Sequence, residues 1–251
     1  MSFVDRTLPL VRGNVTLFGR DPGPLIGRVT QPVLLVLLLQ PLYVSAMGDE
    51  ARGTAQVVLG ELVMFSLLGM SIVGSSILTE RRWNTFDRLR ATPARAPELL
   101  AGKAVPVIGF LLLQQAILLT LGATVLGLKI ADPALLLLAN LVWAATILCM
   151  GAAIAMTVKS LAQFSAVVDI GSTIVAGLSG ALVPLSAMPD WARTIAPLWP
   201  GYWAMGSLRS AVEGNRHATL VAVAVLLAFA TAGAVIAATR LRHGWGRNTL
   251  L

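Results

Sequence analysis

The chain has 251 residues, of which 56% are hydrophobic and 12% are charged, and its mean hydropathy is +0.79. This composition is typical of an integral membrane protein and leaves no room for a large soluble domain. The formal net charge of +7 does not indicate nucleic-acid binding, because membrane proteins gather basic residues in their cytoplasmic loops. The single cysteine, Cys149, excludes a disulfide framework within the chain and a cysteine-based metal site.

Residues 3–20 carry the pattern of an amphipathic helix, with polar and charged residues around one apolar stripe. The stripe consists of Val4, Leu8, Val11, Val15 and Phe18. Such a helix suits the membrane surface, where its arginines lie among lipid headgroups. Because charges run through this segment, we do not expect it to be a cleavable signal peptide.

Two apolar runs follow, over residues 25–47 and 53–79. Each has the roughly 20 residues that a helix needs to cross a bilayer. Pro32 and Pro41 can kink the first run, and Arg28 near its start can extend to the membrane surface. The two runs therefore predict two antiparallel membrane-spanning helices.

The longest charged passage of the chain, residues 80–96, separates the second span from the third. The residues that recur there at helical spacing are Trp83, Phe86, Leu89 and Arg90. A short helix would place their aromatic edge beside a cationic one, and Pro93 would end it by disfavouring a helical Thr92. Such a helix in a cytoplasmic loop suits docking of a soluble partner. A basic loop that only sets the membrane topology fits the composition equally well.

Three further apolar runs cover residues 104–127, 133–157 and 160–184. Pro97 is well placed as the first residue of the helix that leads into the first of them. Residues 185–217 are too interrupted to span, but their aromatic residues suit a membrane interface, so we expect short re-entrant helices there. A sixth, uncharged run covers residues 218–239. The sequence thus predicts an all-α integral membrane protein with six transmembrane helices in one domain over residues 1–251.

The distribution of basic residues predicts the orientation. With six spans both termini lie on one side, and fourteen of the nineteen basic residues fall on that side with residues 80–96. The five on the other side are Arg52, Lys129, Arg193, Arg209 and Arg216. Since basic loops stay in the cytoplasm, we expect both termini and the charged loop to be cytoplasmic.

Two acidic residues lie within the predicted spans, and an ionised carboxylate at the bilayer centre costs about 2.5–3.5 kcal/mol. Asp169 lies deep in the fifth span, so it either lines a substrate or subunit interface or is neutralised within the helix bundle. Glu61 is nearer the outer side, and we expect it at a hydrated helix end. Gln40, Gln114, Gln115 and Asn140 are expected to form hydrogen bonds between helices.

Motifs for nucleotide, metal and protease chemistry are missing or incomplete. The only Gly-Lys pair, at Gly102, lacks the other residues of a phosphate-binding loop, and the two histidines fall at opposite membrane faces. Residues 177–180 match the glycine-flanked serine of rhomboid-type proteases, but the sixth span offers no histidine base. Ser172, Ala176 and Gly180 recur every four residues, which indicates instead a small-residue face for close helix packing.

The order of these elements resembles the membrane subunit of type-2 ATP-binding-cassette exporters, the group of the drug-resistance and nodulation-factor exporters. The loop is similar to the family pattern of an acid–base pair, a threonine, a hydrophobe, an acidic–basic–Leu run and Thr-Pro. The matching residues are Glu80, Arg81, Thr85, Phe86, Asp87, Arg88, Leu89, Thr92 and Pro93, with Asn84 where the family has glycine. The outer segment resembles the family's Met-Pro-x-Trp stretch, a later Pro and a Leu-Arg pair. Its matching residues are Met188, Pro189, Trp191, Pro200, Leu208 and Arg209.

This resemblance implies two permease subunits, identical or homologous, in a bacterial cytoplasmic membrane, with two separate ATPase subunits that hold ATP and magnesium. This chain is then not itself an enzyme and binds no cofactor of its own. Residues 80–93 become a coupling helix whose apolar side enters the ATPase while Arg88 and Arg90 meet its acidic rim. The first and fifth spans are expected to line the subunit interface and the substrate pathway. Candidate pathway residues are Asp169, Gln40, Ser172 and Ser179, and Trp203 joins the outer re-entrant segment.

The expected cargo is an amphiphilic or lipid-like compound, such as a drug, an antibiotic or a lipid, because the predicted spans around Asp169 are largely apolar. The alternative is a membrane protein that does not transport, either an immunity or scaffold protein or an intramembrane enzyme. A transport subunit needs an ATPase at its central loop, whereas an enzyme needs a reactive set of side chains in its spans.

Overall fold

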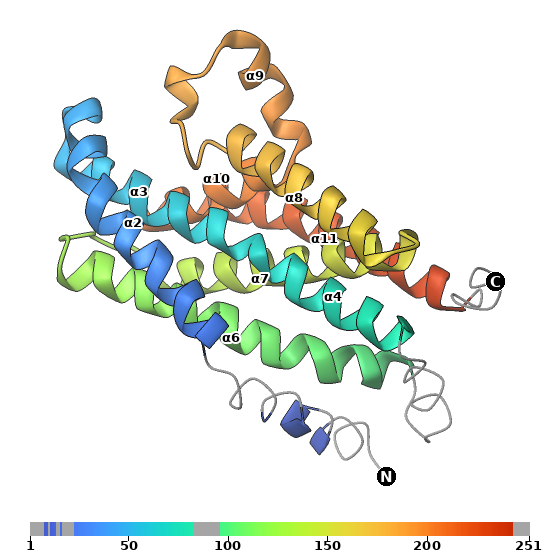
Figure 1. Ribbon diagram of the computed structural model, residues 1–251. Helices are drawn as coiled ribbons and strands as arrows, with labels where there is room; N and C mark the ends of the chain where they lie inside the picture. The colour runs from blue at the N-terminus through green and yellow to red at the C-terminus, as the bar shows by residue number, and fades with distance from the viewer. Residues whose placement is uncertain (1–7, 10, 14–15, 17–22, 83–95, 243–251) are drawn as a thin grey trace.

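Long apolar runs bounded by helix caps fold into long helices, and these helices dominate the computed structural model, which describes residues 8–9, 11–13, 16, 23–82 and 96–242. They lie alongside one another in a bundle, from which the loop that carries α9 projects (Figure 1). The long helices are α2 (Gly23–Met47), α3 (Glu50–Ser66), α4 (Leu68–Arg82), α6 (Ala96–Thr124), α7 (Pro133–Thr157), α8 (Leu161–Leu178) and α11 (Arg216–Arg242). The shorter ones are η1 (Leu185–Ala187), α9 (Asp190–Ile195), η2 (Ala196–Leu198) and α10 (Pro200–Val212).

The prediction of an all-α membrane protein is confirmed at this level. Within the described residues, six helical stretches are long and apolar enough to cross a bilayer, with α3 and α4 together forming the second. The expected surface helix over residues 3–20 lies largely outside the described residues. Helix α2 continues through Pro32 and Pro41, and Pro97 is the second residue of α6.

Side-chain caps explain where several helices begin. Asp49, Asp132 and Ser160 each accept a hydrogen bond from a backbone N–H in the first turn of α3, α7 and α8, respectively. Such caps satisfy amide groups that have no partner within the helix, and each typically contributes about 1 kcal/mol. The polar residues between the apolar runs therefore define the helix starts.

The second span is divided, which the sequence did not predict. Helix α3 ends at Ser66 and α4 begins at Leu68. The Arg28 guanidinium of α2 donates a hydrogen bond of 3.3 Å to the carbonyl of Leu68. The Ser66 hydroxyl accepts one of 3.2 Å from the Gln115 amide of α6. Polar groups from two neighbouring helices thus surround the break.

The fifth span is shorter than predicted, and its end is a correction to the sequence analysis. The helix stops at Leu178 rather than near Pro184, and Gly180 follows with a left-handed φ of +80°. A glycine in this conformation ends a helix without a steric penalty, and the apolar run that continues to Pro184 hides this signal. The irregular segment therefore begins at residue 179, before the 185–217 segment that was predicted.

The core is centred on α7, which packs most extensively against α11. Its Trp143 and Ile147 are almost fully buried, as is Leu226 of α11. The Thr146 hydroxyl donates a hydrogen bond of 3.1 Å to the Leu226 carbonyl. A Cβ atom on Gly233 would lie 2.9 Å from the Cys149 carbonyl carbon, so the two helices touch backbone to backbone. Small residues at a crossing point permit this approach between membrane helices.

Replacing Gly233 by Ala should therefore destabilise the folded chain by about 1–3 kcal/mol, because α11 would have to move away from α7. The matched control is Gly109→Ala in α6, where an added Cβ meets no heavy atom within 4 Å. Thermal unfolding of the purified chain in detergent, followed by tryptophan fluorescence, measures both. The close α7–α11 contact is contradicted if the Gly233 variant unfolds at or above the temperature of the control.

Candidate functional site

The predicted coupling segment falls mostly outside the described residues. Glu80 and Arg81 belong to the last turn of α4, and the chain resumes in α6 at Ala96. The other predicted coupling residues lie in the undescribed stretch: Trp83, Thr85, Phe86, Arg88, Leu89, Arg90, Thr92 and Pro93. The docking role of these residues therefore stays a prediction. The structure describes the two helices that flank the segment, α4 before it and α6 after it.

At the opposite end of the bundle, the Gln56 side chain joins three elements. Its amide nitrogen donates hydrogen bonds of 2.7 Å and 3.0 Å to the carbonyls of Gly180 and Ala181, just beyond the end of α8. Its amide oxygen accepts a hydrogen bond from the Arg209 guanidinium of α10. Gln56 is 1% exposed, so these bonds are shielded from water. One buried amide of α3 thus holds both the end of α8 and the helix that follows the irregular segment.

Arg209 is the charged member of this network. Burial lowers the pKa of its guanidinium, and the nearby Glu213 carboxylate opposes that shift. A cation that faces a neutral amide is less well stabilised than one that faces a carboxylate. Arg209 therefore retains capacity to bind a further anionic group.

Two glycines bring the backbones of this region into contact. A Cβ on Gly60 of α3 would lie 2.4 Å from the Ala181 carbonyl oxygen. A Cβ on Gly201 of α10 would lie 2.9 Å from Cβ of Ser179. Larger residues at these positions would push α3 or α10 away from the end of α8. These close contacts involve Ser179 and Ala181, which flank Gly180, the last residue of the predicted small-residue face.

The remaining outer-segment residues define its shape. Pro189 precedes α9, and Pro200 is the first residue of α10. Met188 is buried, whereas Trp191 is 66% exposed and free to contact lipid or another subunit. The Trp203 indole donates a hydrogen bond of 2.8 Å to the Pro197 carbonyl. Short helices are present in this segment, and their depth in a membrane stays a prediction.

Helices α2 and α8 expose more of their apolar surface than the other spans do. On α8 the exposed residues include Val167, Ile170 and Ile174, and Asp169 lies among them. Asp169 therefore lies on the exposed face of α8 among the described residues, and its role stays a prediction. Neighbouring Ser172 has a buried hydroxyl with no hydrogen-bond partner among the described residues.

The other polar candidates are engaged within the chain. The Gln40 amide of α2 donates a hydrogen bond of 3.4 Å to the Thr54 hydroxyl of α3. The Ser179 hydroxyl donates to the Ala176 carbonyl and accepts from the Ala181 N–H, at 2.8 Å and 3.0 Å, respectively. These bonds stabilise helix contacts and the end of α8, and a role of either residue in a substrate pathway stays a prediction.

The expectation for Glu61 is wrong. It lies in the middle of α3 and is only 4% exposed, and one carboxyl oxygen has no hydrogen-bond partner within the described residues. The sequence placed it near a hydrated end because it is only a few residues into an apolar run. The structure extends that helix back to Glu50, which moves Glu61 inward.

Sequence reasoning missed Gln56, the residue that organises this end of the molecule. Its signal was available, since Gln56 is a polar residue inside a run of apolar ones. Its partners were not available, because they are carbonyls more than a hundred residues away that become free only where α8 stops.

Comparison with known proteins identifies a family. The sequence pattern of the ABC-2 type transporter family matches residues 7–212. The chain is 26% identical over 219 residues to the linearmycin resistance permease protein LnrN of Bacillus subtilis, which covers 86% of this chain and 54% of LnrN. It is 25% identical over 225 residues to the probable doxorubicin resistance ABC transporter permease protein DrrC of Mycobacterium tuberculosis, which covers 85% of this chain and 79% of DrrC. The chain thus spans about half the length of LnrN.

Replacing Gln56 by Leu should loosen the segment between α8 and α9, because two carbonyls and a guanidinium lose their buried partner. The expected cost is about 1–3 kcal/mol. Amide hydrogen exchange at residues 179–189 of the purified chain should become faster. Gln40→Leu is the matched control, since it removes an amide that makes one longer hydrogen bond. Equal exchange rates in the two variants would contradict the role of Gln56.

Proposed function

The chain belongs to the ABC-2 type transporter family, and from this premise we propose that it is the membrane permease subunit of an ATP-driven exporter. The observation that carries this proposal is the family match over residues 7–212, which takes in five of the six long apolar stretches. The chain is a multi-pass membrane protein and a transport subunit, and ATP hydrolysis belongs to partner subunits. Its complex would contain two permease subunits and two ATPase subunits.

Energy coupling would take place at the loop between α4 and α6. Residues 80–93 would form a helix on the ATPase surface, with Phe86 and Leu89 in an apolar cleft and Arg88 at its acidic rim. The ATPase would hold ATP and magnesium. Because α4 and α6 lead directly into this loop, closure of the ATPase subunits around nucleotide would displace both helices.

Helices α2 and α8 would meet the second permease subunit and border the substrate pathway. This role of α2 and α8 is supported by their exposed apolar surface, which includes Leu34, Leu38 and Ile170. Asp169 would line this interface, where a carboxylate can contact a polar group of the partner or of the cargo. The apolar surface around it suits an amphiphilic or lipid-like cargo that moves from the cytoplasm or the inner leaflet.

Two further observations support the assignment. LnrN and DrrC are named for resistance to linearmycin and doxorubicin, which favours drug-like or antibiotic cargo for this chain as well. Fourteen of the nineteen basic residues fall on the side of the termini and of residues 80–96. That asymmetry favours an orientation with both termini in the cytoplasm. The bacterial origin of LnrN and DrrC favours a bacterial cytoplasmic membrane.

Replacing both Phe86 and Leu89 by Asp should lower substrate-stimulated ATP hydrolysis of the assembled complex by at least about tenfold, because buried hydrophobic anchors dominate such interfaces. Membrane insertion of the chain should stay normal. The control is Leu198→Asp, which adds a carboxylate to a 72% exposed leucine in the outer segment and should leave coupled hydrolysis unchanged. Normal coupled hydrolysis in the correctly inserted double variant would overturn the coupling role.

A cysteine at Ile170 should cross-link to a second permease subunit in native membranes, because that residue lies on the exposed face of α8. The background is Cys149→Ala, which removes the single native cysteine. Val235→Cys on α11 is the matched control, with an exposed fraction of 60% against 63% for Ile170. Mass spectrometry of the product identifies the partner. Equal cross-linking at both positions, or cross-linking at Val235 alone, would contradict the proposed interface.

A further inference from the structure

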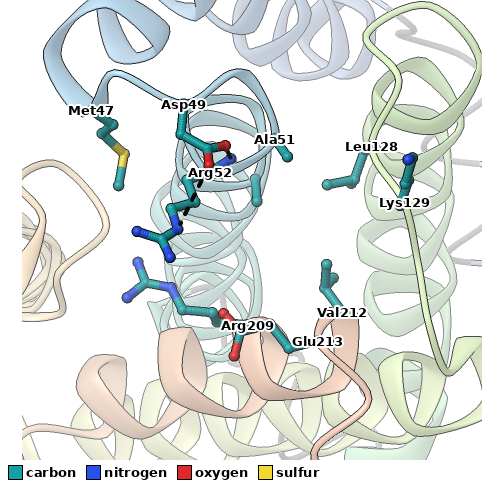
Figure 2. A pocket seen from close by; sticks show the side chains of 10 residues that line it. Met47, Asp49, Ala51, Arg52, Leu128, Lys129, Arg209, Val212 and Glu213 are labelled. Atoms are coloured by element: carbon teal, nitrogen blue, oxygen red, sulfur yellow. Dashed lines mark hydrogen bonds and ion pairs between the residues drawn. The ribbon is translucent and has the colours of Figure 1, made fainter.

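A cavity of about 570 Å³ opens at the end of the bundle where α2 turns into α3 (Figure 2). Its walls come from the turn between α2 and α3, the first turns of α3, the loop between α6 and α7, and the end of α10. The Gln56–Arg209 network lies next to it, because Arg209 also lines the cavity. Its volume falls within the range of about 300–1,000 Å³ that is common for small-molecule sites.

Three basic residues line this cavity: Arg52, Lys129 and Arg209. They are three of the five basic residues on the side predicted to face outward. The other two are paired with carboxylates, since Arg193 contacts Asp190 and Arg216 contacts Asp132. Outward-facing loops carry few basic residues as a rule, so the gathering of these three at one cavity calls for an anionic partner.

The acidic residues of the cavity do not neutralise these cations fully. Arg52 approaches Asp49 at 3.9 Å, and both side chains are largely exposed, so the pair contributes at most about 1 kcal/mol. Asp49 also uses its other oxygen to cap α3. Arg209 donates to the neutral amide of Gln56, and Lys129 has neither an ion pair nor a hydrogen bond among the described residues. With Glu213 as the second acid, the lining holds three positive and two negative groups.

The side chains of Arg52 and Arg209 extend towards the same side of the cavity (Figure 2). Two like charges held together repel, and an anion between them converts that repulsion into attraction. Guanidinium groups bind phosphate through paired, charge-assisted hydrogen bonds. This side of the cavity therefore suits a phosphate group.

The same cavity also has an apolar surface next to these charges, which is formed by Met47, Leu128 and Val212. The cavity also lies where the membrane-spanning helices end, since α2 stops at Met47 and α3 begins at Glu50. Lipid headgroups occupy this level of a bilayer, and their acyl chains extend from it along the helices. A free phosphate ion would use the cations but not the apolar wall.

We propose that this cavity binds the headgroup of an anionic phospholipid, with Arg52 and Arg209 at the phosphate and the apolar residues against the glycerol and the first acyl carbons. Lys129, on the opposite wall, adds its positive charge to the cavity (Figure 2). The site belongs to this chain alone and does not depend on the ATPase coupling proposed above. A lipid bound there would bridge the α2–α3 turn, the α6–α7 loop and α10.

Native mass spectrometry of the full-length chain in mild detergent tests the proposal, with short-chain phosphatidylglycerol as the probe and phosphatidylcholine of the same chain length as the zwitterionic comparison. The unaltered chain should retain phosphatidylglycerol preferentially. Lys129→Gln and Arg52→Gln should each weaken that binding by about fivefold to tenfold. Arg193→Gln is the control, because it removes an outer cation that does not line the cavity. It should bind as the unaltered chain does.

Lys129→Gln keeps the test decisive even where another variant fails to fold, because Lys129 is exposed and makes no hydrogen bond or ion pair in the described part of the chain. The proposal is overturned if phosphatidylglycerol and phosphatidylcholine are retained equally, or if the Lys129 and Arg193 variants bind alike. If inorganic phosphate displaces bound phosphatidylglycerol as strongly as added phosphatidylglycerol does, the cavity is a site for free anions. That result would also overturn the lipid assignment.

Discussion

Every backbone carbonyl that lies within a bilayer needs a hydrogen-bond donor from the protein, and the rest of the structure depends on how this constraint is met. The long helices satisfy it internally. Where a helix stops, three side chains from α2 and α3 supply the donors. Arg28 donates to the Leu68 carbonyl at the break in the second span, Tyr43 to the Leu182 carbonyl, and Gln56 to the carbonyls of Gly180 and Ala181. The irregular parts of the molecule are thus held by the α2–α3 hairpin.

This arrangement joins the two ends of the permease. Helices α3 and α4 run from the cavity at the α2–α3 turn, through the break at Leu67, to the loop at which the ATPase would dock. They are also the most buried span, so they cannot slide without moving their neighbours. In the proposed mechanism, displacement of the coupling loop would reach the end of α8 and α10 through Gln56 and the backbone contact at Gly60. The exposed faces of α2 and α8 would then alter their fit to the second subunit.

The sequence alone predicted those features of the fold that depend on a local signal. Apolar runs of bilayer length gave the six spanning stretches, and the loop and outer-segment motifs gave the family. It did not predict the features that depend on contacts between distant parts of the chain. The end of α8 at Leu178 depends on Gln56 as a partner for freed carbonyls, and an apolar sequence that continues to Pro184 conceals it. Glu61 was misplaced because α3 extends further back than hydropathy indicates. The placement of Arg52, Lys129 and Arg209 around one cavity required the fold.

The central claim is that this chain works as the permease of an ATP-driven exporter. The most direct measurement is to purify the tagged chain in mild detergent from its native membrane and to identify the proteins that accompany it by mass spectrometry. The account predicts a near-stoichiometric soluble protein with a phosphate-binding loop, together with a second copy of this chain or a homologous permease. A chain that purifies alone, and that stimulates ATP hydrolysis by no candidate ATPase added to it, would contradict the account.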